Sequence, residues 1–302
     1  MTGDAIKPID ERSPKSRRRW FSFSLRSLML LVVVIAIPLA WKVNRARNQR
    51  IVVAELEKLN AVRDGISKAI LHITYDYEIV QVAGRKTYPN VPPPGPKWLV
   101  DFFGKEYLVE VSAVTIYNPQ VTDATIALIA RLPKIEYLTL GSPNITDDGL
   151  VHFAGMHNLE TLELYSNNLT GADLVHLAGL KRFKKLTFSG RTTDVFLEQI
   201  SKLNDLEFLQ FFGTAQITDR GLAHIAKLHK LKSLRFEFKQ VLAVGEDYVR
   251  ITDEGLVNLH GLKNLEILIL NTTQVTQTGI DDLQKALPIR KFSWNGSRVG
   301  PR

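Results

Sequence analysis

Residues 135–164 read IEYLTLGSPNITDDGLVHFAGMHNLETLEL and contain the pattern on which the fold depends. An apolar triplet spaced i, i+3, i+5 opens the stretch at Ile135 and closes it at Leu159, one period of 24 residues later. The last two residues of such a triplet point the same way on a short strand. The ITDDGL block between the triplets offers Thr and Asp, which are preferred at helix N-termini. The stretch therefore predicts a strand, a turn and a helix, followed by another strand.

The same triplet recurs along most of the chain. Successive triplets are separated by 24, 24, 24, 23, 25, 34 and 24 residues, and a block resembling ITDDGL follows all but the last. One such unit cannot bury its apolar face alone, so we expect the units to stack into a solenoid. The predicted fold class is α/β, a curved parallel sheet on the concave side and short helices on the convex side. The triplets begin at Val111, Ile135, Leu159, Phe183, Leu206, Leu231, Leu265 and Ile289.

Two residue types in the second block have an expected structural role. The aspartates are interpreted as helix caps, and glycines are expected where each helix packs on its neighbour. These glycines are Gly149, Gly221, Gly255 and Gly279. The repeat that begins at Phe183 departs from the pattern, because its block TTDVFL lacks both the Ile and the Gly.

LxxLxL followed by ITDxGLxxLxxL resembles the leucine-rich repeat in its helix-bearing form, over residues 111–295. The whole chain is also similar to a family of membrane-anchored leucine-rich-repeat proteins abundant in planctomycete bacteria. That likeness includes RRRWFSFSLRSLMLLVVVIAIPLAW with the ARNQR after it, and YDYE and PPPGPKWL before the repeats. It implies a layout and a topology, and it implies no catalytic residue.

The excess positive charge is N-terminal. Of 39 Lys and Arg and 31 Asp and Glu, residues 1–50 hold eleven basic and three acidic residues, which leaves 28 of each in residues 51–302. A nucleic-acid-binding domain needs a basic folded surface, whereas these charges flank a single apolar run, as they do beside a membrane segment. We therefore expect no nucleic-acid partner.

Residues 20–43 are predicted to be a transmembrane signal anchor that follows a basic tail, residues 1–19. As a helix, residues 20–43 reach about 36 Å against roughly 30 Å of hydrocarbon, with Trp20 and Trp41 at the ends. A cleaved signal peptide is the alternative, but Pro38-Leu39-Ala40 matches a small-x-small cleavage site poorly. Residues 8–27 carry six basic residues and residues 42–60 carry five. This small difference favours an internal N-terminus and an extracytoplasmic repeat domain.

Residues 44–110 are predicted to form an N-terminal cap for the repeat domain, residues 111–302. Apolar positions three or four apart in residues 44–71 predict an amphipathic helix, broken near Gly65, that packs on its own neighbouring domain. The alternating residues 70–80 predict a strand at the first sheet edge. PNVPPPGP predicts an extended connector, with an SH3-type ligand as the alternative, and residues 98–103 a short helix.

No motif in the chain points to catalysis or to a cofactor. The chain has no cysteine, which excludes disulfides, Cys-ligated metals and thiol catalysis. HExxH, GxSxG, GxGxxG and phosphate-loop patterns do not occur, and a metal site is not expected from His152, His176 and His224, because no third ligand recurs beside them. Four N-x-S/T sequons imply glycosylation only in a host with an endoplasmic reticulum. They begin at Asn144, Asn168, Asn271 and Asn295.

The candidate binding residues lie between the inward-facing apolar positions, where side chains must point to the concave face. In register they form three columns that begin at Ala113, Thr115 and Tyr117. Exposed aromatic residues are favoured at interface centres, although the same residues are also good strand formers. The predicted concave-face site consists of Tyr117, Tyr137, Tyr165, Phe208, Phe212 and Arg235.

The expected function is a membrane-anchored interaction module that binds a protein or another envelope macromolecule. The alternatives are a structural cell-envelope component without a specific ligand and a cytoplasm-facing, membrane-tethered adaptor. An insertion at residues 237–250 accounts for the interval of 34 residues. We expect it to be a rim loop that folds back near Arg235 and Phe212 or contacts a partner, with simple packing on its own repeat as the alternative.

Overall fold

The computed structural model of the protein describes residues 24–61, 70–76, 80–82, 85–87, 95–238, 250–270, 274–294 and 297–299. The chain divides into two units, Met1–Val43 and Asn44–Arg302. Helix α1 (Leu25–Ala61) begins in the first unit and ends in the second.

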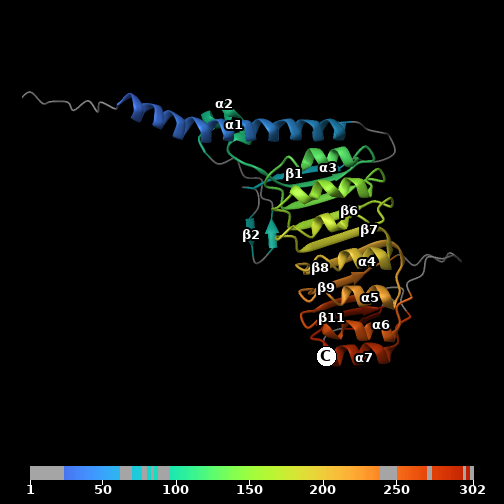
Figure 1. The fold of residues 1–302 in the computed structure, drawn as a ribbon. Helices are drawn as coiled ribbons and strands as arrows, with labels where there is room; N and C mark the ends of the chain where they lie inside the picture. Colours follow the sequence, from blue (N-terminus) through green and yellow to red (C-terminus); the bar gives the residue numbers. More distant parts are fainter. Residues whose placement is uncertain are drawn as a thin grey trace, which may run out of the picture. The chain divides into compact units, whose positions relative to one another are not determined.

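The second unit is an alternation of strands and short helices (Figure 1). Its strands are β1 (Ile70–Tyr75), β2 (Val80–Val82), β3 (Arg85–Thr87), β4 (Val111–Tyr117), β5 (Tyr137–Gly141), β6 (Thr161–Tyr165), β7 (Lys185–Thr193), β8 (Phe208–Gln216), β9 (Ser233–Phe236), β10 (Ile267–Leu270), β11 (Lys291–Trp294) and β12 (Ser297–Val299). Its helices after α1 are α2 (Lys97–Phe103), η2 (Lys105–Tyr107), α3 (Asp123–Ile129), η3 (Asp147–Gly155), η4 (Leu174–Leu177), α4 (Asp194–Ile200), α5 (Asp219–Ile225), α6 (Asp253–Val257), η5 (Asn258–Gly261) and α7 (Gln277–Ala286).

One sheet runs through the repeats in the order β1-β4-β5-β6-β7-β8-β9-β10-β11-β12. Strands β4 to β11 are parallel, each paired with the strand of the next repeat, and β1 and β12 close the two edges in antiparallel pairing. The prediction that the strand after residue 70 forms the first sheet edge is confirmed. Strands β2 and β3 form a separate antiparallel pair.

The apolar triplets supply the core, as predicted. The middle residues of the triplets from Leu138 to Leu268 are at most 1% exposed. Phenylalanines replace leucine in the central repeats, and their rings pack in succession, with Phe188 to Phe196 at 4.3 Å and Phe211 to Phe236 at 5.3 Å between centroids. Close packing of this kind between repeats is what a single 24-residue unit cannot provide by itself.

The second blocks begin helices, but not all of them are α-helices. The block ITDDGL leads into the 3₁₀ helix η3, which begins at Asp147, and the block LTGADL leads into the 3₁₀ helix η4, which begins at Leu174. In the block LTGADL, Gly171 stands where other repeats have aspartate and adopts a φ of +82°. This left-handed conformation cannot continue a right-handed helix, so η4 begins three residues later.

The aspartates of the second blocks link repeats, so their expected role as helix caps is wrong. In every second block except LTGADL, threonine is the N-cap, so the predicted helix start is confirmed for threonine. The aspartate that follows it reaches the threonine of the next repeat. Asp219 is typical: its two carboxylate oxygens accept from the backbone nitrogen and hydroxyl of Thr252, at 2.8 and 2.7 Å. The same pairing joins Asp123 to Thr146, Asp147 to Thr170, Asp194 to Thr218, and Asp253 to Thr276.

Residues 44–61 of α1 cap the N-terminal end of the repeat core. Val52 and Leu56 are fully buried in that core. The Gln49 side chain donates to the carbonyl of Val109 at 2.9 Å and accepts from the amide of Val111 at 3.0 Å, so it pairs with the start of β4 as a backbone would. The prediction that this amphipathic stretch packs on its own neighbouring domain is confirmed.

Helix α1 is continuous where two helices were expected. It runs through Pro38 and through residue 43 without interruption, because residues 44–61 are rich in Ala, Glu, Leu and Arg, which favour helix. Trp20 and Gly65 lie outside the described residues. Among the described helices, α1 is long and apolar enough to cross a membrane, and its apolar window is not buried. A signal sequence at the N-terminus would meet the same criteria.

Candidate functional site

The strand register places the predicted columns on one face of the sheet. Tyr137 pairs with Ala113 on one side and Thr161 on the other, and Thr139 pairs with Thr115 and Glu163. These residues alternate with the buried triplet positions, so their side chains leave the core on the side that we call the concave face. Asn271, the last member of the third column, lies outside the described residues.

The third column forms a hollow at the carboxyl ends of β4, β5 and β6 and beside Ser189 in the middle of β7, which we call the tyrosine pocket. The Tyr117 and Tyr165 rings lie 5.4 Å apart between centroids, with Gly141 on the strand between them. A Cβ atom at Gly141 would lie 2.3 Å from the Tyr117 ring, so only glycine lets that ring lie across β5. The hollow has a volume of about 400 Å³. Its walls are Tyr117, Asn118, Pro119, Gly141, Ser142, Pro143, Tyr165, Ser166, Asn167 and Ser189.

A carboxylate lies beside the tyrosine pocket. Oε2 of Glu163 accepts from the hydroxyls of Tyr165 and Thr139, each at 3.3 Å. Burial raises the pKa of the Tyr165 phenol most, and the neighbouring Glu163 carboxylate adds to that rise. Burial also raises the pKa of Tyr117. Both phenols therefore remain neutral hydrogen-bonding groups at physiological pH.

A second cluster of predicted residues lies on β8 and β9. The Arg235 guanidinium stands over the Phe208 ring, 5.1 Å from its centroid. The same side chain donates to the Ser233 hydroxyl at 3.2 Å and lies 4.0 Å from the Glu237 carboxylate. The contact with the Phe208 ring and the polar contacts with Ser233 and Glu237 hold the guanidinium in place beside the ring.

The structure does not bring all six predicted residues together. Tyr117 joins Tyr165, and Phe208 joins Arg235, but Tyr137 turns its hydroxyl toward Glu160 at the rim, 3.3 Å away. Phe212 is half-buried on β8 beside Ser189 of β7. Residues 239–249, which make up most of the insertion expected near Phe212 and Arg235, lie outside the described residues.

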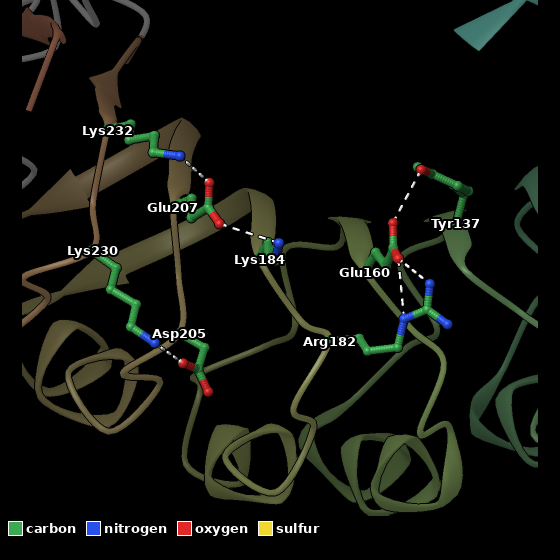
Figure 2. Close-up of polar contacts among 8 residues, drawn as sticks. All are labelled: Tyr137, Glu160, Arg182, Lys184, Asp205, Glu207, Lys230 and Lys232. Carbon is green, nitrogen blue, oxygen red and sulfur yellow. Dashed lines mark hydrogen bonds and ion pairs between the residues drawn. The ribbon is translucent and has the colours of Figure 1, made fainter. Parts of the chain in front are cut away.

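Ion pairs between repeats follow the rim where each strand begins, and the sequence reasoning missed them (Figure 2). Glu207 binds Lys232 at 2.7 Å and Lys184 at 3.4 Å. Asp205 binds Lys230 at 2.5 Å, and Arg182 pairs with Glu160. The sequence signal for part of this network was the residue before each strand, because from Glu160 onward this position alternates in charge along the repeats. It is occupied in turn by Glu136, Glu160, Lys184, Glu207, Lys232, Glu266 and Arg290.

The hydrogen bonds from Lys232 and Lys184 lower the pKa of Glu207, with the Lys232 bond as the largest cause. Lys230 likewise lowers the pKa of Asp205. These pairs are exposed, so each adds little to stability by itself. We interpret the rim pairs as fixing the register of neighbouring repeats. Across the described residues, no group of three His, Asp or Glu side chains is arranged to hold a metal ion.

The sheet register, the buried triplets and the short helices together define a leucine-rich-repeat solenoid of the α/β class with an N-terminal helix. No protein-family model matches the chain. Solved structures with a similar arrangement include an internalin C2 of Listeria monocytogenes, with 23% identity, 61% of this chain and 80% of that chain covered, and a TM-score of 0.42.

Two further similar structures are leucine-rich-repeat proteins. One is from Leptospira interrogans, with 17% identity, coverage of 54% of this chain and 43% of that chain, and a TM-score of 0.32. The other is the ectodomain of the Arabidopsis thaliana membrane receptor kinase GASSHO1/SCHENGEN3 in complex with Casparian strip integrity factor 2. It has 15% identity, coverage of 61% and 24%, and a TM-score of 0.35. Because these TM-scores are below 0.5, we assign the fold from the chain's own repeats.

Proposed function

We propose that this protein is a membrane-anchored leucine-rich-repeat module that binds a segment of another protein across its concave face, and that it acts by binding rather than by catalysis. The observation that carries the proposal is the tyrosine pocket. Its two rings are half-buried and held against each other, so little side-chain freedom is lost when a ligand covers them. Aromatic side chains in such positions dominate many protein interfaces.

The two concave clusters are spaced for an extended ligand. Tyr117 is on β4 and Arg235 is on β9, five strand steps away in the sheet order. At about 4.8 Å per step this is about 24 Å, the length of about seven extended residues. Glu163 beside the tyrosine pocket favours a basic ligand residue there. A peptide strand crossing the sheet could therefore contact both clusters at once.

The membrane anchor is part of the same proposal. Residues 20–43 would span the membrane, with the repeat domain on the extracytoplasmic side, which is the layout implied by the resemblance to planctomycete membrane-anchored repeat proteins. The apolar, uncovered first part of α1 supports this assignment. In the sequence, the unit that carries the repeats begins at Asn44, directly after the proposed span.

Site-specific photo-crosslinking in cells tests the binding proposal. The full-length protein carries a benzoyl-phenylalanine in place of Tyr165 or Phe208, and a control carries it in place of Val195, which is 62% exposed on α4 away from the concave face. We expect one discrete adduct from each concave position and none from the control. We also expect Arg235→Ala to reduce that adduct, because Arg235 positions the second cluster.

Adducts of equal yield from concave and helix-side positions would overturn the binding proposal. Absence of any adduct from either concave position, with normal amounts of the protein in the membrane, would do the same. Either result would favour the alternative of a structural envelope component without a specific ligand.

A further inference from the structure

Helix α2 exposes two large aromatic side chains one turn apart. Trp98 is 66% exposed and Phe102 is 79% exposed, which makes them the most exposed large apolar residues described in the second unit. Residues four apart lie on the same side of a helix, so the two rings form one apolar surface. Water contact over rings of this size is unfavourable, and such surfaces usually mark an interaction site.

The segment that follows α2 is attached to the first turns of the second unit. The Arg50 guanidinium lies 3.5 Å from the Glu106 carboxylate. It also packs on Gly104, where a Cβ atom would lie 2.2 Å from it. A second ion pair joins Arg45 to Glu110 at 2.6 Å. Helix α2 is therefore fixed near residues 45–50 of α1.

Residues 45–50 follow the apolar stretch of α1 almost at once. Arg45 comes two residues after Val43 and Arg50 comes seven residues after it, which corresponds to about 3 Å and about 10 Å of helix rise. The headgroup layer on each side of a bilayer is roughly 5–8 Å thick. If residues up to 43 cross the membrane, the attachment points of α2 lie in or just beyond the headgroups.

We propose that α2 is an interfacial membrane-binding segment whose Trp98 and Phe102 rings insert among the lipid headgroups of the leaflet from which α1 emerges. This inference rests on the proposed membrane anchor. Tryptophan is enriched at that depth because its ring has an apolar body and a polar N–H. Arg47, four residues after Val43 on α1, and Lys97, at the start of α2, have exposed side chains. Their positive charge suits anionic headgroups. Asp101 is the acidic residue on α2. The second unit would then contact the bilayer at two places, the end of the span and α2.

Fluorescence quenching by brominated lipids tests the depth of α2. The full-length chain keeps Trp98 as its only tryptophan, with Trp20, Trp41 and Trp294 changed to phenylalanine, and is reconstituted in phosphatidylcholine and phosphatidylglycerol vesicles. The control chain has Trp98→Phe and Val195→Trp in the same background. Val195 is a matched position because it is 62% exposed and lies on α4, several repeats away from the cap. We expect lipids brominated near the headgroup to quench Trp98 strongly, deeply brominated lipids to quench it less, and neither to quench the control.

The outcomes separate this inference from the anchor on which it depends. Protein that floats with vesicles after alkaline extraction, but whose Trp98 is quenched no more than the control, would keep the anchor and overturn the role of α2. Stronger quenching by the deep bromines would also overturn it. Protein that does not float with the vesicles would overturn both proposals.

A second variant covers the case in which loss of Trp294 weakens the fold. The chain has no cysteine, so Asp101→Cys and Val195→Cys can each carry a single environment-sensitive dye with all tryptophans in place. We expect a blue-shifted emission from the dye at 101 in vesicles and an unshifted emission from the dye at 195. Equal emission from the two positions would contradict the placement of α2 at the lipid surface.

Discussion

Replacing Gly255 with alanine tests whether the aspartates of the second blocks hold the repeats together. The new Cβ atom would lie 2.0 Å from Oδ1 of Asp219 in the preceding repeat. That carboxylate is fixed by the two hydrogen bonds from Thr252. Either the helix shifts, at about 1–3 kcal/mol for overpacking, or Asp219 withdraws and loses charge-assisted hydrogen bonds of about 1.5–3 kcal/mol. Because these responses are alternatives, we expect a loss of about 2 kcal/mol in the free energy of unfolding.

Urea unfolding of the full-length protein in detergent, followed by far-ultraviolet circular dichroism, measures the effect. Gly261→Ala is the matched control, because a Cβ atom added there would meet no atom within 4 Å and the backbone of Gly261 is ordinary. There alanine should be neutral or stabilise by up to about 1 kcal/mol. Combining Gly255→Ala with Asp219→Gly should destabilise less than the sum of the two single changes. Equal stability of the two alanine variants, or strict additivity in the double variant, would refute the steric link between the repeats.

Three further outcomes follow from the site, the rim and the anchor. Tyr165→Phe removes the hydroxyl that donates to Glu163 and should change stability by less than about 1 kcal/mol. Tyr165→Ala also removes the ring that packs against Tyr117 and should lower the melting temperature clearly. An equal loss of stability in the two variants would contradict the contact between the rings. The pKa of Glu207 is lowered from 4.5 in the folded state, so its ion pairs stabilise above that pH and are lost as the pH falls through the lower, folded-state value. At pH 7 the protein should therefore be more stable than Glu207→Gln by about 0.5 kcal/mol, as expected for an exposed pair, and at pH 2 the two should be equally stable. Urea unfolding at both pH values measures this difference. A difference that stays the same at the two pH values would contradict the prediction. Alkaline phosphatase fused after Arg302 should be active, and the mature protein should retain residues 20–43; an inactive fusion would favour the cytoplasm-facing adaptor.

The concave columns were predictable because side chains alternate between the two faces of a strand, so the buried positions fix which residues face outward. Once the triplet residues such as Leu162 and Leu164 face the core, the residues between them must face the other way. A constant period then fixes which residues become neighbours, and the observed pairing of Tyr137 with Thr161 follows directly. What the period could not show is how far each side chain turns within its column. Tyr137 reaches the rim, whereas Tyr165 turns toward Glu163.

The role of the aspartates was missed because a local explanation was sufficient. Thr-Asp before an apolar run has the composition of a helix start, and nothing within one repeat distinguishes a cap from a bridge. The bridge becomes visible only across the 23 residues between Asp123 and Thr146. The rim pairs were missed for the same reason, since Lys232 and Glu207 are 25 residues apart and meet only when the strands are in register.

The junction between the third and fourth repeats shows that two departures from the pattern explain each other. At four other junctions an aspartate faces a glycine of the next repeat, as Asp194 faces Gly221. Here Gly171 replaces the aspartate, and Phe196 replaces the following glycine. A Cβ atom at Gly171 would lie 2.2 Å from the Phe196 ring, so the space left by the missing carboxylate is filled by that ring, which also packs 4.3 Å from Phe188 between centroids. An apolar contact between repeats thus takes the place of the polar Asp–Thr pair at this junction, and the stack continues.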